Sequence, residues 1–439
     1  MGRKTLAVAA LIAVTALTAT GCTGAAAPKG ESAAAATDPS SVSGTITVLT
    51  HRTDLVQNGT MKRYAAAFNK IYPKVTVKFE AITDYEGEVK IRMNTANYGD
   101  VLMIPNAIAK KDYPSFFASL GSNAELSKKY RFTGNTNVGG KVYGLATVGN
   151  ANGFVYNKAV WKKAGITAWP TSPQKFLTDL KAVKAKTGAV PYYTNFKDQW
   201  PLTAGTASIG SVSCDAQAND KLATSTAPWA EGGDLNVIDT LLYDVVHDKL
   251  IEKDPTTTNW ESSKGLLARG KIATMQLGSW AITQMQSAAK TAGTNPDDIG
   301  FMPFPAQQDG KFCAILSSDY QQAVSIHSQH KAAARAWVDW FTEKSGFAQN
   351  EGSIPTAKSG ALPDTLKPFE DNGVALLEQS QAKGAQVNAI DNAAEIGLAK
   401  PDYRAKLVDM ARGVQSGSLK DYFADLNKKW SEAEKTAGS

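Results

Sequence analysis

The order of strands and helices after residue 44 constrains the fold more than any other feature of the chain. Residues 45–49 (TITVL) form a β-branched run, and residues 75–81 alternate apolar and polar side chains as a strand does. Between them, apolar residues from 61 to 71 recur at helical spacing, and a second helix then leads to the apolar run DVLMI at 100–104. This order predicts a parallel sheet with helices on its faces.

A second set of strands and helices begins near Gly153 with the run GFVYN. The later segments predicted as helices or strands are a helix starting at Ser172-Pro173, a helix at 237–250, a helix at 260–269, a strand at 272–277, a helix at 333–341 and two amphipathic helices in the last 40 residues. The chain has 439 residues, and domains commonly hold about 100–200 residues. Two α/β lobes are therefore predicted.

The N-terminus has the pattern of an export signal. Arg3 and Lys4 precede an apolar run at 6–17, which is too short to cross a hydrocarbon core of about 30 Å but suits a signal peptide. Small residues and then Cys22 follow, which resembles a bacterial lipobox, whose cysteine becomes the acylated first residue of the mature protein. Residues 1–21 are thus interpreted as a lipoprotein signal peptide. The alternative is a plain secretory signal with an incidental cysteine.

Residues 22–43 are rich in Ala, Ser, Thr, Gly and Pro without apolar periodicity. Such a segment buries too little surface to offset its chain entropy, so we expect a flexible tether. No later stretch approaches 18 consecutive apolar residues, so we expect the folded body to lie outside the bilayer.

Two cysteines remain after Cys22, Cys214 and Cys313. An extracytoplasmic compartment permits a disulfide between them, and two separate buried thiols are the alternative.

Charge and motifs narrow the classes of function. The chain holds 47 Lys+Arg and 41 Asp+Glu with no clustered basic stretch, so no nucleic-acid partner is predicted. No nucleophile elbow, phosphate-binding loop, HExxH or CxxC motif is present, and the four histidines are dispersed, so we expect neither a cofactor nor a metal. A pair of acids for glycoside hydrolysis has no recognisable sequence pattern, which leaves a glycosidase open.

Three tryptophans, Trp200, Trp229 and Trp280, lie outside the helical stripes. A flat apolar ring beside polar side chains suits the C–H faces and hydroxyl rims of sugars. A loop tryptophan that closes the edge of a core is the alternative for each of them.

Five short segments form an ordered set along the chain. They are YGDV at 98–101, GGKVYGL at 139–145 followed by GNANGFVYNK at 149–158, GKIATM at 270–275 with GSWA at 278–281, AVSI at 323–326 and GSIP at 352–355. This set resembles segments of the maltose-binding-like solute receptors of ABC importers, family 1 of the bacterial extracellular solute-binding proteins, and its second member is similar to their first crossover. Ala146-Thr147 and Trp161 depart from the family pattern.

The resemblance implies a two-lobed, periplasmic-binding-protein-like α/β fold of type II, with a ligand cleft between lobes joined by crossover strands. It assigns residues 44–150 and 316–348 to the N-lobe and residues 151–315 and 349–439 to the C-lobe. It also implies a monomer without enzymatic activity that delivers its ligand to the membrane permease of an ABC importer.

Carried over by position, the resemblance implies a set of ligand-binding residues on both lobes. They are His51, Arg52, Asp54, Asn106, Asn150, Trp200, Trp280, Asp319 and Tyr320. Arg52 and Asp54 suit vicinal hydroxyls, because a guanidinium donates and a carboxylate accepts in fork geometry. The alternative for residues 51–54 is a helix start with a solvated charge pair.

The function expected from these observations is a lipid-anchored extracytoplasmic receptor on the outer face of the cell membrane, with an oligosaccharide as its ligand. A receptor for a peptide or polyamine and a lipid-anchored glycosidase are the alternatives.

Overall fold

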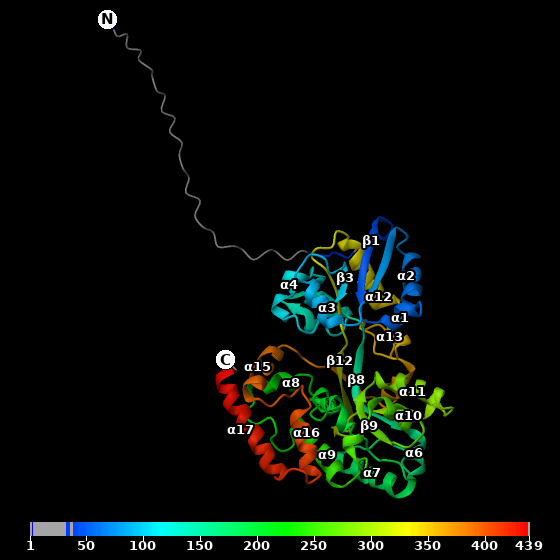
Figure 1. Cartoon of the computed structure of the whole chain (residues 1–439), viewed down its shortest axis with the longest axis vertical. Coiled ribbons are helices and arrows are strands. Elements are labelled where there is room, and N and C mark those ends of the chain that lie inside the picture. The colour runs from blue at the N-terminus through cyan, green and yellow to red at the C-terminus, as the bar shows by residue number, and fades with distance from the viewer. Residues whose placement is uncertain (1, 3–31, 36–37, 438–439) are drawn as a thin grey trace.

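The structure is a computed structural model that describes residues 2, 32–35 and 38–437. It has two α/β lobes stacked along the long axis, with strands β8 (Gly149–Asn157) and β12 (Lys311–Ser318) running between them (Figure 1). The two lobes predicted from the alternation of strands and helices are confirmed. Apart from Gly2, the predicted signal peptide lies outside the described residues, as does Cys22.

The N-lobe is built on a five-stranded sheet in the order β2-β1-β3-β13-β7. Its strands are β1 (Gly44–Thr50), β2 (Val75–Ala81), β3 (Val101–Met103), β7 (Leu145–Ala146) and β13 (Gln321–Val324). β1 pairs in parallel with β2 and β3, whereas β13 runs antiparallel to β3 and β7. A small sheet of β4 (Gly121–Ser122), β5 (Asn137–Val138) and β6 (Lys141–Val142) lies beside it. The predicted parallel start of the sheet is confirmed, and the chain returns to it as β13 after crossing the C-lobe.

Helices cover this sheet. They are α1 (Thr53–Gln57), α2 (Thr60–Asn69), α3 (Tyr85–Arg92), α4 (Tyr113–Phe116), α5 (Asn123–Lys129), α12 (Lys331–Lys344) and α13 (Phe347–Asn350). The core joins Phe68 of α2 to Trp337 of α12, whose rings meet edge to face at 5.3 Å. The helical spacing in the sequence therefore identified the faces of α2 and α12 that pack against the core.

The C-lobe sheet is mixed rather than parallel. Its strands, besides β8 and β12, are β9 (Thr274–Gly278), β10 (Ile299–Met302), β11 (Gln307–Gln308) and β14 (Ala375–Glu378). β8 is antiparallel to β9, β10 and β12, and β14 pairs in parallel with β12. Gly153 of β8 must be glycine, since a Cβ there would lie 2.3 Å from the carbonyl oxygen of Met302.

The C-lobe helices surround this sheet. They are α6 (Lys158–Lys163), α7 (Pro173–Thr187), α8 (Ala218–Lys221), α9 (Asp234–His247), α10 (Trp260–Ala268), α11 (Ala281–Thr291), α14 (Lys367–Asp371), α15 (Gly384–Ala394), α16 (Asp402–Ala411) and α17 (Leu419–Ala437). α7 begins at the predicted position because Ser172 accepts a hydrogen bond from the Lys175 amide, and Pro173 suits the first helical turn. Among the described residues, no helix combines the length and apolarity needed to cross a bilayer.

The chain passes between the lobes at β8, at β12–β13 and again after α13. Phe347 and Ala348 of α13 pack in the N-lobe core, and the Asn350 amide donates to the Tyr64 hydroxyl at 2.8 Å. Ile354 then lies in a C-lobe core. The N-lobe therefore extends a few residues beyond the predicted boundary at 348, because α13 completes its core.

Part of the predicted tether is docked on the N-lobe. The Ala33 amide donates to Ser119 O at 2.9 Å, and the buried Arg335 guanidinium donates to Ala33 O at 2.9 Å. Residues 39–41 form a short 3-10 helix, and Val42 is buried. Ser32, Ala33 and Val42 of the predicted tether therefore contact the N-lobe, and composition does not reveal these contacts.

Cys214 and Cys313 are joined as a disulfide in the structure, with their Cα atoms 5.3 Å apart. The bond links the loop after residue 208 to the crossover strand β12.

Candidate functional site

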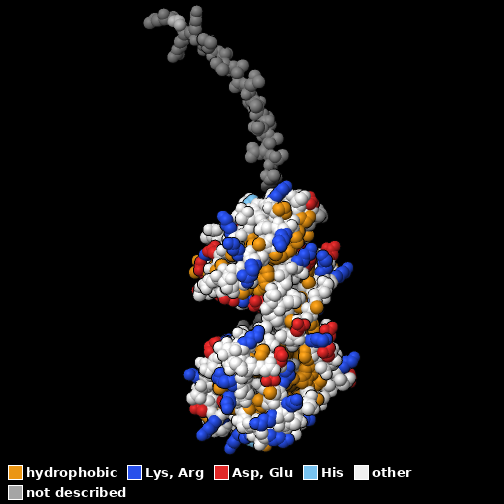
Figure 2. All heavy atoms as spheres, turned by 90° about the vertical axis from the view of Figure 1, so that its right-hand side faces the viewer, with side chains coloured by type: hydrophobic (Ala, Val, Ile, Leu, Met, Phe, Trp, Pro, Cys, Tyr) orange, Lys and Arg blue, Asp and Glu red, His pale blue; other side chains and the backbone are white. Residues whose placement is uncertain are grey.

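The candidate site lies where the two lobes face each other. Figure 2 shows a constriction between the lobes that is bordered by Lys, Arg, Asp and Glu side chains. A hollow of about 270 Å³ lies on the N-lobe side and is lined by four parts of the chain. They are residues 104–106 after β3, Tyr113 of α4, Asn135, and residues 318–321, which run from the end of β12 to the start of β13.

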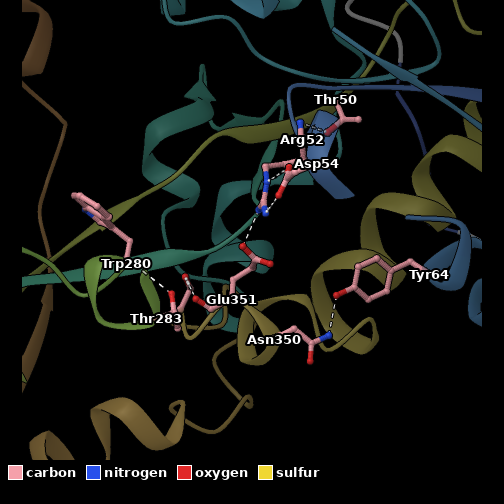
Figure 3. A network of polar contacts seen from close by, with 9 residues as sticks. Thr50, Arg52, Asp54, Tyr64, Trp280, Thr283, Asn350 and Glu351 are labelled. Carbon is pink, nitrogen blue, oxygen red and sulfur yellow. Dashed lines mark hydrogen bonds and ion pairs between the residues drawn. The ribbon is translucent and has the colours of Figure 1, made fainter. Parts of the chain in front are cut away.

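Arg52 and Asp54 bind each other. The Arg52 Nε and Nη2 donate to the two Asp54 oxygens at 2.9 and 2.8 Å, and Nη1 donates to Glu351 at 2.7 Å. The hydrogen bonds from Arg52 lower the pKa of the Asp54 carboxyl. Figure 3 shows this network between the end of β1 and α13, with Trp280 apart on the C-lobe side. The predicted fork for sugar hydroxyls is thus already used within the protein, which matches the alternative of a charge pair at a helix start.

His51 belongs to an aromatic cluster on the N-lobe wall. Its ring lies 4.8 Å from the Tyr320 ring and 6.0 Å from the Tyr85 ring. Burial lowers the pKa of His51, although the nearby Asp319 raises it, so the imidazole is neutral at pH 7. Its Nδ1 is buried without a hydrogen-bond partner.

Glu86 connects two of the predicted residues. Its Oε1 accepts hydrogen bonds from the side-chain amide of Asn106 at 2.9 Å and from the Tyr320 hydroxyl at 2.6 Å. The other oxygen accepts from the Asn106 backbone N–H at 2.9 Å. Sequence reasoning missed Glu86, because an acid in the first turn of a helix is common for its favourable interaction with the helix dipole.

Asn150 lies on the crossover strand β8, and Asp319 lies in the turn that follows the crossover strand β12. Asn150 is 9% exposed on β8, and its Oδ1 has no hydrogen-bond partner. Asp319 is exposed, and its backbone N–H donates to Val148 O at 3.0 Å. Both residues therefore sit where the chain passes between the lobes.

The C-lobe side carries a cluster of three tryptophans. Trp200 lies 5.9 Å from Trp280 and 5.2 Å from Trp260, and Trp260 lies 5.6 Å from Trp280, all between ring centroids. Trp200 begins the 3-10 helix η5 (Trp200–Ser208), Trp260 begins α10, and Trp280 directly precedes α11. Trp260 could not be recognised as part of this cluster from the sequence, because it begins a segment whose spacing predicts a helix. Trp229 is instead buried and donates to Asp239 at 2.8 Å, so it closes a core.

The turn before Trp200 is strained. Asn195 and Gln199 adopt left-handed backbone conformations with φ of 52° and 65°, which non-glycine residues rarely do. A buried Asp198 oxygen in this turn has no hydrogen-bond partner. Such strain is often found at binding sites, where the surrounding structure holds it.

All the predicted residues except Asn150, which lies on β8, fall into three groups. His51, Asn106, Asp319 and Tyr320 meet on the N-lobe wall, Trp200 and Trp280 meet on the C-lobe, and Arg52 and Asp54 are paired with each other. Within residues 32–35 and 38–437, no three His, Cys, Asp or Glu side chains group as metal ligands.

Solved structures of two binding proteins are similar to this chain along nearly its whole length. A binding protein of an ABC transporter from Bifidobacterium animalis subsp. lactis, solved in complex with mannobiose, is 33% identical to this chain. The match covers 91% of this chain and 96% of that protein, with a TM-score of 0.77. A manno-oligosaccharide-specific solute-binding protein from the same organism, solved with mannotriose, is 32% identical over 90% of this chain and 95% of its own, also with a TM-score of 0.77.

A multiple sugar-binding protein of Streptococcus mutans is 23% identical over 327 residues, which are 71% of this chain and 75% of that protein. The structural matches confirm the predicted type II fold. The sequence model described as "Bacterial extracellular solute-binding protein" matches residues 53–346, well over half of the chain. This description is of extracellular proteins that bind solutes. The chain belongs to the bacterial extracellular solute-binding protein family.

Proposed function

We propose that this protein is a carbohydrate receptor of an ABC importer, with an oligosaccharide held between the lobes. The tryptophan cluster of the C-lobe supports this proposal most directly. Three rings within 6 Å of one another form an apolar platform, and a wall of amide, hydroxyl and carboxylate groups stands on the other lobe. Sugars present both an apolar face and polar edges, so this pairing suits them.

The charges of the cleft leave the polyamine alternative to experiment. Arg52 pairs with both Asp54 and Glu351, so these three side chains together keep one negative charge. Glu86 accepts hydrogen bonds from Asn106 and Tyr320, neither of which is basic, and Asp319 makes no ion pair among the described residues. Because a polyamine binds acids through its ammonium groups, spermidine belongs in the binding test below.

Manno-oligosaccharides of two or three residues are the ligands to test first, since two solved relatives were crystallised with mannobiose and mannotriose. The ligand, by bridging both walls, would favour the closed form through its higher affinity for that form.

The proposal includes a membrane anchor, a permease and a monomeric receptor. Cys22 follows the signal sequence in a lipobox-like context, so we propose that it carries the lipid that holds the receptor at the outer face of the membrane. Metabolic labelling with an alkyne fatty acid would mark the wild-type chain and not Cys22→Ser. Equal labelling of both chains would place the lipid elsewhere.

The ligand class is tested by calorimetry and thermal shift on the purified full-length chain. Mannobiose and mannotriose are compared with raffinose, maltose, spermidine and a tetrapeptide. We expect a mannoside to raise the melting temperature, since a ligand that binds only the folded state stabilises it. Binding of spermidine or the peptide alone would overturn the carbohydrate proposal, and release of free sugar from any glycoside would support the glycosidase instead.

A further inference from the structure

Two polar side chains of the N-lobe hollow, Asn106 and Tyr320, donate hydrogen bonds to Glu86. An ionised carboxylate only accepts, so both the Tyr320 hydroxyl and the Asn106 amide must donate to Glu86. This assignment follows from the chemistry of Glu86. It leaves the Tyr320 oxygen and the Asn106 Oδ1 as acceptors.

Gln321 shows the same pattern. Its amide nitrogen donates to Ser318 Oγ at 2.8 Å and to the Asp319 backbone carbonyl at 3.2 Å. Because a carbonyl only accepts, the orientation of this amide is also fixed. The Gln321 Oε1 is buried without a partner, in a side chain that lines the hollow and is 9% exposed.

Asn135 and Asp319 complete the wall. The Asn135 amide nitrogen donates to Ser318 Oγ at 2.8 Å, and the Asp319 carboxylate is an acceptor by nature. Buried polar groups are normally satisfied, and one that is not commonly awaits a partner. The Tyr320, Asn106, Gln321 and Asp319 oxygens can therefore accept from a ligand, and we call them the acceptor wall. The hollow also holds donors, since the Ser318 hydroxyl keeps its own proton and the Asn106 amide keeps a second N–H.

We propose that Glu86 is a positioning residue that fixes the hydrogen-bond polarity of Tyr320 and Asn106, so that the acceptor wall selects ligand hydroxyl groups that donate to it. The inference rests on the proposed carbohydrate function. It implies that the subsite rejects a sugar whose hydroxyl there is methylated or acetylated, and a sugar that bears a carboxylate or sulfate at that point.

The first test uses mannobiose analogues in which one hydroxyl at a time is replaced by fluorine or by hydrogen. Fluorine retains weak acceptor capacity but cannot donate. At one or more positions we expect both analogues to bind at least about 10-fold more weakly than mannobiose, because neither fluorine nor hydrogen on carbon can donate a hydrogen bond to the acceptor wall. We call the loss measured with the fluoro analogue the fluorine penalty. Every fluoro analogue binding within about 2-fold of mannobiose would overturn the inference.

The second test compares Glu86→Gln with Glu88→Gln as a matched control. Glu88 lies on the same helix and pairs with Arg92, without a contact to Asn106 or Tyr320. The new amide of Glu86→Gln donates to the Tyr320 oxygen and releases the Tyr320 proton toward the hollow. We expect mannobiose affinity to fall about 10-fold and the fluorine penalty to shrink to under about 3-fold, with both unchanged in Glu88→Gln. An unchanged fluorine penalty in Glu86→Gln contradicts the inference.

A third measurement needs no sugar. Burial raises the pKa of Tyr320, and the hydrogen bond to Glu86 raises it further. In ¹³Cζ-tyrosine NMR, with the Tyr320 signal assigned by its loss in Tyr320→Phe, we expect this pKa to be lower in Glu86→Gln than in the wild type and in Glu88→Gln. Equal values in all three chains would show that Glu86 does not hold the Tyr320 proton.

These three tests distinguish failure of the carbohydrate proposal from failure of the acceptor-wall proposal. Failure of every mannoside to bind, together with a Glu86-dependent Tyr320 titration, overturns the carbohydrate ligand and retains the acceptor wall. Normal mannobiose binding with no fluorine penalty overturns the acceptor wall and retains the receptor.

Discussion

At the scale of single residues, the C-lobe tryptophans differ in role although they look alike in the sequence. Trp229 is 2% exposed, whereas Trp200 is 39% exposed and stands beside Trp260 and Trp280. No local pattern separates a tryptophan that fills a core from one that faces a cleft, because the difference arises from segments that meet only in the folded chain.

Replacing Trp280 by alanine removes one ring of the platform. We expect mannoside affinity to fall by roughly 1–3 kcal/mol, the scale of one large ring contact. Calorimetry measures the change, and Tyr243→Ala serves as the control, since Tyr243 stacks on His247 of α9 outside the cluster. An unchanged dissociation constant would remove Trp280 from the site.

His51 makes stability depend on pH. Its pKa is lowered in the folded state, so the unfolded chain binds more protons than the folded chain between the folded-state pKa and the ordinary value near 6.5. Stability contributed by the neutral imidazole is therefore present above pH 6.5 and is lost as the pH falls through that window. We expect His51→Gln to lose less stability than the wild type between pH 7 and pH 5, measured by urea unfolding. Parallel curves for the two chains would contradict this.

The residues of the N-lobe wall were partly predictable. Asn106, Asp319 and Tyr320 follow strand ends, where a family resemblance transfers by position, and they line one hollow. Arg52 and Asp54 have the chemistry for sugar hydroxyls but lie close enough to bind each other, and Glu351 comes from 299 residues away. Sequence distance hides such a partner, as it hides the contact of Glu86 with Tyr320.

At the scale of elements, most helices and strands followed from periodicity, but η5 did not. This nine-residue 3-10 helix has no amphipathic repeat. Its position depends on Arg404 of α16, which donates to Thr206 Oγ1 at 2.6 Å and to Asp239 of α9 at 2.7 Å. A Cβ on Gly205 would lie 2.8 Å from the Arg404 guanidinium carbon, so the packing of η5 on this side chain requires glycine. The segment that presents Trp200 is therefore shaped by a distant arginine.

Arg404→Met is expected to destabilise the C-lobe by about 3–5 kcal/mol, because it leaves the buried Asp239 carboxylate without its ion pair. The free energy of unfolding in urea measures the effect. Arg92→Met is the matched control, since Arg92 pairs with Glu80 and Glu88 at the surface, and it should cost no more than about 1 kcal/mol. A similar loss in both variants would show that burial of the Arg404–Asp239 pair does not matter.

At the scale of the whole molecule, the lobes are joined by strands, and the Phe132 ring packs where one of them begins. Phe132 has a left-handed φ of 65°, and its ring lies against Gly149 at the start of β8, where a Cβ would lie 2.5 Å from the ring. The Phe132 backbone N–H donates to Glu378 at the end of β14 at 2.7 Å. The order of family-like motifs implied the crossover at β8 but not these contacts that hold its start.

We expect mannotriose to lower the radius of gyration in small-angle X-ray scattering, since a ligand held by both walls favours the closed form. Trp280→Ala at the same mannotriose concentration should keep the radius of the free receptor. A ligand that binds with no change in radius would show that the receptor does not close around it.

The contacts of Ser32 and Ala33 with the N-lobe set the length of the free tether in the proposed lipid-anchored form. Ten Cα–Cα steps separate Cys22 from Ser32, and an extended chain covers at most about 3.3–3.6 Å per residue. The point of attachment on the N-lobe therefore stays within roughly 36 Å of the lipid. If Cys22 carries the proposed lipid, the receptor stays in a shallow layer above the membrane, and it searches for its permease in two dimensions rather than three.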